Sequence, residues 1–144
     1  MIEVERIADV LGGPRVLRRR VRSLDDLRVT VAGGLPKLAL TACAKRLAAD
    51  PKEQRAFIHA VVPEATYKRR RGAMKPSESE RTERLARVIA TAEYVWGNRD
   101  DARRFLLSPH PRFEGKRPVD IAWSEIGARQ LEELLWQIHH GLPA

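Results

Sequence analysis

Two groups of basic side chains have the charge and the spacing to bind a polyanion. Residues 15–22 contain five arginines, and residues 68–75 contain three arginines and two lysines. The whole chain carries 27 lysines and arginines against 19 aspartates and glutamates, a net charge of +8. Residues 97–144 hold as many acidic as basic side chains, so the excess lies entirely in residues 1–96. This asymmetry predicts two binding roles, one of them on a nucleic acid.

The second basic group falls in a pattern that is typical of a helix-turn-helix. Apolar residues at positions 56, 57 and 60 predict one helix, and Pro63 ends it because proline disfavours helical geometry in the residue before it. Residues 64–71 are expected to form a second short helix, with Ala65 facing inward. Such a helix enters the major groove of DNA, where arginine can bind guanine through two hydrogen bonds. We expect base contacts from Thr66 and Arg69, and phosphate contacts from Lys68, Arg70, Arg71 and Lys75.

The sequence contains no grouping of residues that is suited to catalysis or to metal binding. It has no glycine-rich phosphate loop and no Cys or His pair at metal-ligand spacing. His139 and His140 are adjacent, so they point in different directions on a helix. The single cysteine, Cys43, sits among apolar neighbours and is expected to be buried. We therefore expect a protein that is not an enzyme and that uses no cofactor or metal.

The distribution of apolar residues argues against a membrane protein. No apolar run approaches the roughly 20 residues that a helix needs to cross a bilayer. Glu3, Glu5 and Asp9 near the N-terminus are not typical of a secretory signal. We expect a cytoplasmic chain that does not bind membranes.

Helix signals recur along the chain, and no segment indicates a strand. Ser23 and Ser77 each precede an acidic residue by three positions, a spacing that favours a helix start. Pro36 is expected at the first position of a helix, and Asp50 with Pro51 repeats the start signal. Asn98 and Ser124 are further candidate caps in the C-terminal part of the chain. The patterns together predict an all-α fold.

The segment 106–122 carries the most specific motif, LLSPHPRFEGKRPVDIA. It contains leucine, Pro-His-Pro, a large apolar residue, glycine and a Pro-Val-Asp-Ile box. An amphipathic helix follows, beginning SEIGARQLEELL at position 124 and ending near Ile138 and Gly141. These features resemble the toxin-binding domain of Xre/MbcA/ParS-type antitoxins. Upstream, residues 76–97 resemble the linker helix of that family, and residues 53–71 its Cro-like helix-turn-helix.

The resemblance covers residues 35–144 and implies a type II antitoxin. The toxin of such a system is typically a RES-domain protein that consumes NAD, and the antitoxin covers its active site. The family commonly dimerises and represses its own operon, so the implied partners are a cognate RES-domain toxin, operator DNA and a second copy of the chain. The implied parts are an N-terminal helical extension (1–34), a Cro-like helix-turn-helix domain (35–76), a linker helix (77–97) and a toxin-binding domain (98–144). The implied toxin-facing residues are Pro109, His110, Phe113, Arg129, Glu132, Glu133, Trp136, His139 and His140.

Three points stay open on the sequence alone. Phe113 and Trp136 suit an interface, where large aromatics act as anchors, but they suit a core equally well. Val61 stands where the family usually has a glycine, and a β-branched residue does not accept left-handed backbone geometry. Either the turn is built differently or DNA binding has been lost. A stand-alone dimeric helix-turn-helix regulator, whose C-terminal part only dimerises, is the alternative function.

Overall fold

The computed structural model describes residues 1–142, and residues 143–144 of the expected C-terminal domain lie outside this range. All regular structure in the described range is helical, so the all-α prediction is confirmed. The helices are α1 (Val4–Val10), α2 (Gly13–Leu17), α3 (Leu24–Ala32), α4 (Lys37–Leu47), α5 (Pro51–Val61), α6 (Glu64–Arg69), α7 (Pro76–Trp96), α8 (Arg99–Leu107), the 3-10 helix η1 (Pro111–Phe113), α9 (Pro118–Ile121) and α10 (Glu125–His139). None of the helices in residues 1–142 combines the length and the apolar character needed to cross a membrane.

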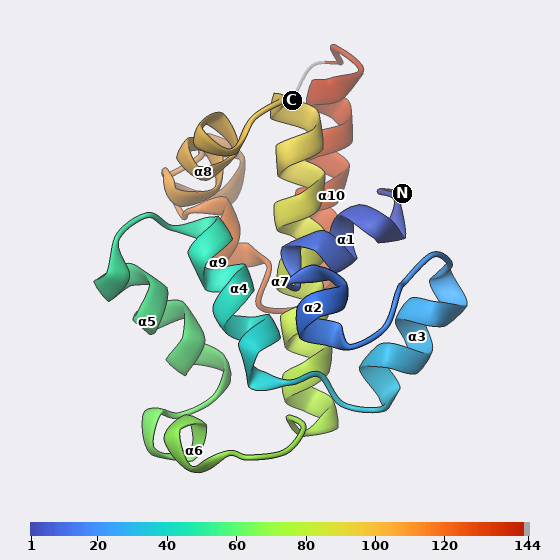
Figure 1. The fold of residues 1–144 in the computed structure, drawn as a ribbon. Coiled ribbons are helices and arrows are strands. Elements are labelled where there is room, and N and C mark those ends of the chain that lie inside the picture. The colour runs from blue at the N-terminus through green and yellow to red at the C-terminus, as the bar shows by residue number, and fades with distance from the viewer. Residues whose placement is uncertain (143–144) are drawn as a thin grey trace.

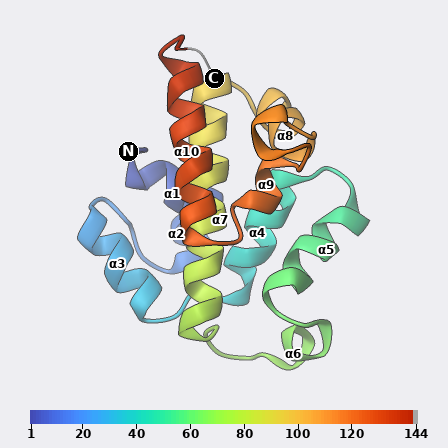
Figure 2. The same cartoon turned by 180° about the vertical axis from the view of Figure 1, so that it is seen from behind.

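Helix α7 is the central support of the molecule. It has 21 residues, which corresponds to about 32 Å at 1.5 Å per residue. Helices α1, α3, α4, α8 and α10 pack around it (Figures 1 and 2). Helix α7 thus carries elements from both the N-terminal and the C-terminal parts.

The expected cap at Ser77 is wrong, because α7 begins at Pro76 and the Glu78 carboxylate accepts a hydrogen bond from the Lys75 backbone N–H at 2.8 Å.

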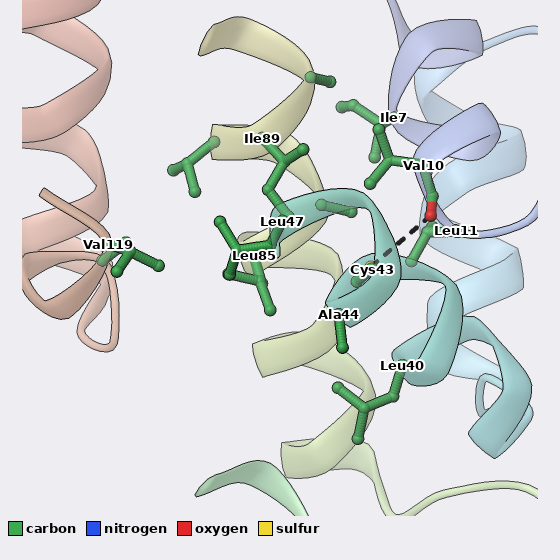
Figure 3. Close-up of a cluster of buried hydrophobic side chains, with 14 of the residues drawn as sticks. Ile7, Val10, Leu11, Leu40, Cys43, Ala44, Leu47, Leu85, Ile89 and Val119 are labelled. Carbon is green, nitrogen blue, oxygen red and sulfur yellow. Dashed lines mark hydrogen bonds between the residues drawn. The ribbon is translucent and has the colours of Figure 1, made fainter. Parts of the chain in front are cut away.

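The core fills the space between α7 and the helices that surround it. Apolar side chains from α1, α4, α7 and α9 meet there, among them Ile7, Leu11, Leu40, Leu47, Leu85, Ile89 and Val119 (Figure 3). Cys43 lies among them, fully buried, and its thiol contacts the Val10 carbonyl oxygen at 3.8 Å. Burial raises the pKa of the Cys43 thiol, so the thiol stays protonated and inert.

Side-chain caps fix the starts of several helices, as the sequence predicts. The capping oxygens accept hydrogen bonds from the backbone N–H three residues later, at Ser23, Asp50, Asn98 and Ser124. Each bond satisfies an amide that the helix itself leaves free. Pro36 differs from the prediction by one position, because it precedes α4 rather than opening it.

Candidate functional site

The turn between α5 and α6 contains no left-handed residue. Val61 is the last residue of α5, Val62 is extended with φ −127° and ψ 119°, and Pro63 follows with φ −53° and ψ 147°. Both valines are buried, with 4% and 1% of their surface exposed. Val61 is thus helical and only Val62 is extended, and valine accepts both geometries, so Val61 does not conflict with a helix-turn-helix.

Tyr67 fixes α6 against the rest of the domain. Its hydroxyl is hydrogen-bonded to Thr41, and its backbone carbonyl accepts a hydrogen bond from Lys37 Nζ at 2.8 Å. The His59 ring stands edge-on to the Tyr67 ring, with centroids 5.9 Å apart. Ala65 is exposed, so the prediction that it faces inward is wrong. Residues two apart on a helix lie about 200° around its axis, so packing the half-buried Tyr67 against α4 turns Ala65 outward.

The residues predicted to contact DNA separate into two groups. Lys68, Arg69, Arg71 and Lys75 are exposed, and Thr66 is half-buried. Lys68 forms a surface ion pair with Glu64 at 3.2 Å, and its hydrogen bond lowers the pKa of that carboxyl. A phosphate can compete for an ion pair as exposed as this one, because such pairs contribute little to stability.

Arg70 lies in an internal ion pair, which corrects its expected place among the surface cations. Its guanidinium contacts Glu78 at 2.8 Å, with 14% and 10% of the two side chains exposed. The hydrogen bond between them raises the pKa of Arg70 and lowers that of Glu78. Arg70 therefore fastens the segment after α6 to the start of α7.

Five of the nine residues expected to face a toxin line one groove beside α10. They are Arg129, Glu132, Glu133, Trp136 and His140. The groove, which we call the α10 groove, has a volume of about 410 Å³. Met1, Ile2, Gln137 and Leu142 also line it. The sequence carries no signal for Met1 and Ile2, because they reach the groove through the packing of the N-terminus beside α10.

The C-terminal end of α10 carries a cluster of aromatic rings. Trp136 is half-buried, and its ring lies 5.7 Å from Tyr94 and 5.5 Å from His139, measured between centroids. The Arg6 guanidinium stacks over Tyr94 at 4.9 Å. Trp136 is therefore packed on one side and open to the groove on the other, an arrangement that suits an interface anchor.

An ion-pair network joins α7 to the wall of the α10 groove. Arg87 on α7 contacts Glu132 at 2.6 Å and Glu83 at 3.2 Å. Burial disfavours the charge on Arg87, but these carboxylates outweigh it and raise its pKa. Glu132 is therefore held from within the molecule, whereas Glu133 next to it is exposed.

The residues of the Pro-His-Pro loop do not line the α10 groove. Phe113 is 9% exposed and belongs to the core, which decides between the two roles left open for it. His110 lies 5.8 Å from both Phe105 and Phe113, and its Nδ1 accepts a hydrogen bond from the Arg112 backbone N–H at 3.0 Å. His110 and Phe113 therefore shape the loop, while Pro109 is exposed beside them. Among residues 1–142, no three His, Cys, Asp or Glu side chains gather in a way that could hold a metal ion.

Comparisons with known proteins match two successive parts of the chain. Residues 26–87 match the antitoxin Xre-like helix-turn-helix domain, and residues 91–141 match the antitoxin Xre/MbcA/ParS C-terminal toxin-binding domain. The chain is also 37% identical over 84 residues to a protein named Antitoxin Xre from Pseudomonas putida. That alignment covers 56% of this chain and 53% of the relative, so it spans about half the length of each. With both family models matched in succession, the chain belongs to the Xre/MbcA/ParS antitoxin family.

Proposed function

We propose that this chain is the antitoxin of a type II toxin–antitoxin system, acting in the cytoplasm. It neutralises a RES-domain, NAD-consuming toxin by covering the toxin's active site, and as a homodimer it represses its own operon. The observation that carries the proposal is the α10 groove, which gathers an aromatic anchor and several charged side chains inside the segment matched to the toxin-binding domain. We divide the chain into an extension (1–34), a DNA-binding domain (35–76), a linker helix (77–97) and a toxin-binding domain (98–144).

The toxin contacts in this proposal come from the groove and its rim. Trp136 is the anchor, Arg129 and Glu133 supply exposed charges, and His139 and His140 complete the end of α10. Pro109 is an outer contact. Glu132, His110 and Phe113 support the surface from inside, since each is engaged in intramolecular packing or an ion pair.

The DNA contacts in this proposal come from α6 and the segment that follows it. Thr66 and Arg69 read bases, and Lys68, Arg71 and Lys75 bind phosphates. Helix α6 and the C-terminal end of α10 lie at opposite ends of the molecule (Figure 1). This separation lets one chain bind DNA and a toxin at the same time.

Co-expression with the product of the neighbouring gene tests the proposal. We expect the neighbour alone to arrest growth and to lower cellular NAD, and this chain to restore growth while forming a complex that co-purifies. A neighbour that is harmless and forms no complex contradicts the antitoxin function. Specific binding of the upstream DNA in that case leaves a stand-alone dimeric regulator as the function.

Replacing Trp136 with alanine is expected to weaken the toxin complex by at least about 30-fold. Truncation of a central aromatic anchor typically costs about 2 kcal/mol or more of binding free energy. The dissociation constant, measured by calorimetry, reports the effect. Trp96→Ala is the matched control, because Trp96 is 38% exposed and packs on Phe105 outside the groove. Equal losses in both variants contradict an anchor role for Trp136.

Replacing Arg69 with alanine is expected to weaken operator binding by about 5-fold to 150-fold, because a bidentate arginine–guanine contact contributes roughly 1–3 kcal/mol. Toxin neutralisation should be unchanged. Arg99→Ala removes the same charge from an exposed position at the start of α8 and should leave operator affinity nearly unaltered. DNA binding is measured by fluorescence anisotropy, and an Arg69 variant that binds like the wild type removes this residue from the interface.

A further inference from the structure

A second basic surface lies beside the helix-turn-helix. A groove of about 620 Å³ is lined by Arg15 and Arg18 of the N-terminal extension, by Lys37, and by Arg70 and Arg71 after α6. We call it the basic groove. Arg15 and Arg18 lie outside the residues matched to the helix-turn-helix domain, which begin at position 26. The groove therefore joins the two basic groups that stand far apart in the sequence.

Close backbone packing builds the basic groove. Gly34 has a φ of +89°, and a Cβ at this position would lie 2.6 Å from the Cβ of Ala73. The Met74 backbone N–H donates a hydrogen bond to the Leu35 carbonyl at 2.8 Å. The segment that leaves α6 is thereby held directly against the loop before α4, and Arg71 lies across from α2.

The cations of the basic groove include several without an internal counter-ion. Other arginines, such as Arg46 and Arg87, bind carboxylates of this chain. Within residues 1–142, Arg15, Arg18 and Arg71 form no salt bridge. Like charges held close together repel one another, and an anionic partner removes this repulsion.

The backbone at Arg18 determines which arginines line the groove. Arg18 is in the left-handed region, with φ 61° and ψ 21°, and it ends α2 by donating its N–H to the Pro14 carbonyl at 2.8 Å. Arginine rarely adopts this geometry. The chain turns here, so that Arg19 and Arg20 line a different hollow, beside Glu5 and Asp9 of α1.

We infer that the basic groove is a second phosphate-binding site, which seats the DNA backbone next to the major groove that α6 enters. The inference rests on the proposed DNA binding and extends it to the N-terminal extension. Arg69 at the end of α6 and Arg71 in the basic groove are both exposed and close in sequence, so the surface of α6 continues into the basic groove. Guanidinium groups bind phosphate oxygens through paired hydrogen bonds, which suits a row of arginines along a duplex.

The salt dependence of DNA binding tests this inference. The probe is a duplex of the DNA upstream of the gene, titrated by anisotropy between roughly 50 and 200 mM salt. The variant Arg15→Ala/Arg18→Asn removes two groove cations, and asparagine keeps the left-handed geometry at position 18 accessible. The control Arg19→Ala/Arg20→Ala removes the same charge from the loop that directly follows α2. Circular dichroism and thermal melting establish that both variants are folded.

The groove variant is expected to lower the slope of log K against log salt by about 2 for each bound chain, since each phosphate contact contributes roughly 0.9. The control should change the slope much less. Equal changes in the two variants, no change in either, or an equal loss of affinity for a duplex RNA overturn the inference. If the wild type binds DNA and responds to Arg69→Ala but not to the groove variant, only this inference fails. If the wild type does not bind at all, the proposed DNA-binding function fails with it.

Discussion

Replacing Gly127 with alanine is expected to lower the free energy of unfolding by about 3 kcal/mol, the upper part of the range for overpacked positions. Gly127 is buried in the first turn of α10. A Cβ there would overlap the carbonyl oxygen of Ile121 and lie 2.9 Å from both its carbonyl carbon and Ser124 Oγ. A backbone carbonyl cannot rotate away as a side chain can, so the start of α10 must move away from α9.

Thermal melting measures this loss, and a decrease of about 10 °C is expected for a chain of this size. Toxin binding should be lost as well, because residues of α10 line the α10 groove. Gly72→Ala is the matched control, since a Cβ at that position meets nothing within 4 Å. A Gly127 variant as stable as the Gly72 variant shows that the α9–α10 junction adjusts freely.

Replacing Arg46 with methionine is expected to destabilise the protein by about 3 kcal/mol, because it leaves a carboxylate without its counter-ion in a largely buried place. The Arg46 guanidinium contacts Glu93 on α7 at 2.9 Å and Asp9 on α1 at 2.9 Å. Only 17% of the Arg46 side chain and 13% of that of Glu93 are exposed. Burial disfavours the charge on Arg46, but its hydrogen bonds to Glu93 and Asp9 outweigh it and raise the pKa of the guanidinium.

Chemical denaturation measures this effect against an exposed pair. Arg28 and Asp25 are 2.8 Å apart, with 69% and 73% of their side chains exposed, so Arg28→Met should change stability by less than about 1 kcal/mol. Replacing Arg46 and Glu93 together with apolar residues should recover part of the loss, because the carboxylate that then remains unpaired, Asp9, is 65% exposed and not buried. A double variant that is less stable than the single one contradicts this explanation.

The sequence predicted those features that depend on neighbours along the chain. The caps at Ser23, Asp50, Asn98 and Ser124 form because each oxygen meets an amide only three residues away. The motif around Pro109 identified the toxin-binding domain for the same reason, since its residues are contiguous.

The sequence could not predict features that depend on tertiary packing. Arg69 and Arg70 are adjacent and identical in type, yet within residues 1–142 only Arg70 meets a carboxylate, on the next helix. In α6, the sequence pattern indicated Ala65 as the inward residue, whereas the hydroxyl contact with Thr41 on α4 turns Tyr67 inward instead. Phe113 had two plausible roles until its packing was known.

Met1 lines the α10 groove, and the N-terminus lies far from α6 (Figures 1 and 2). This geometry has a practical consequence for anything fused to or immobilised through the protein. A tether at Met1 orients the molecule with α6 toward the bulk solution. A sensor surface built this way measures duplex binding well, but it obstructs the opposite face, which holds the α10 groove. Assays of the opposite face are better served by a label placed on an exposed loop position such as Gly72.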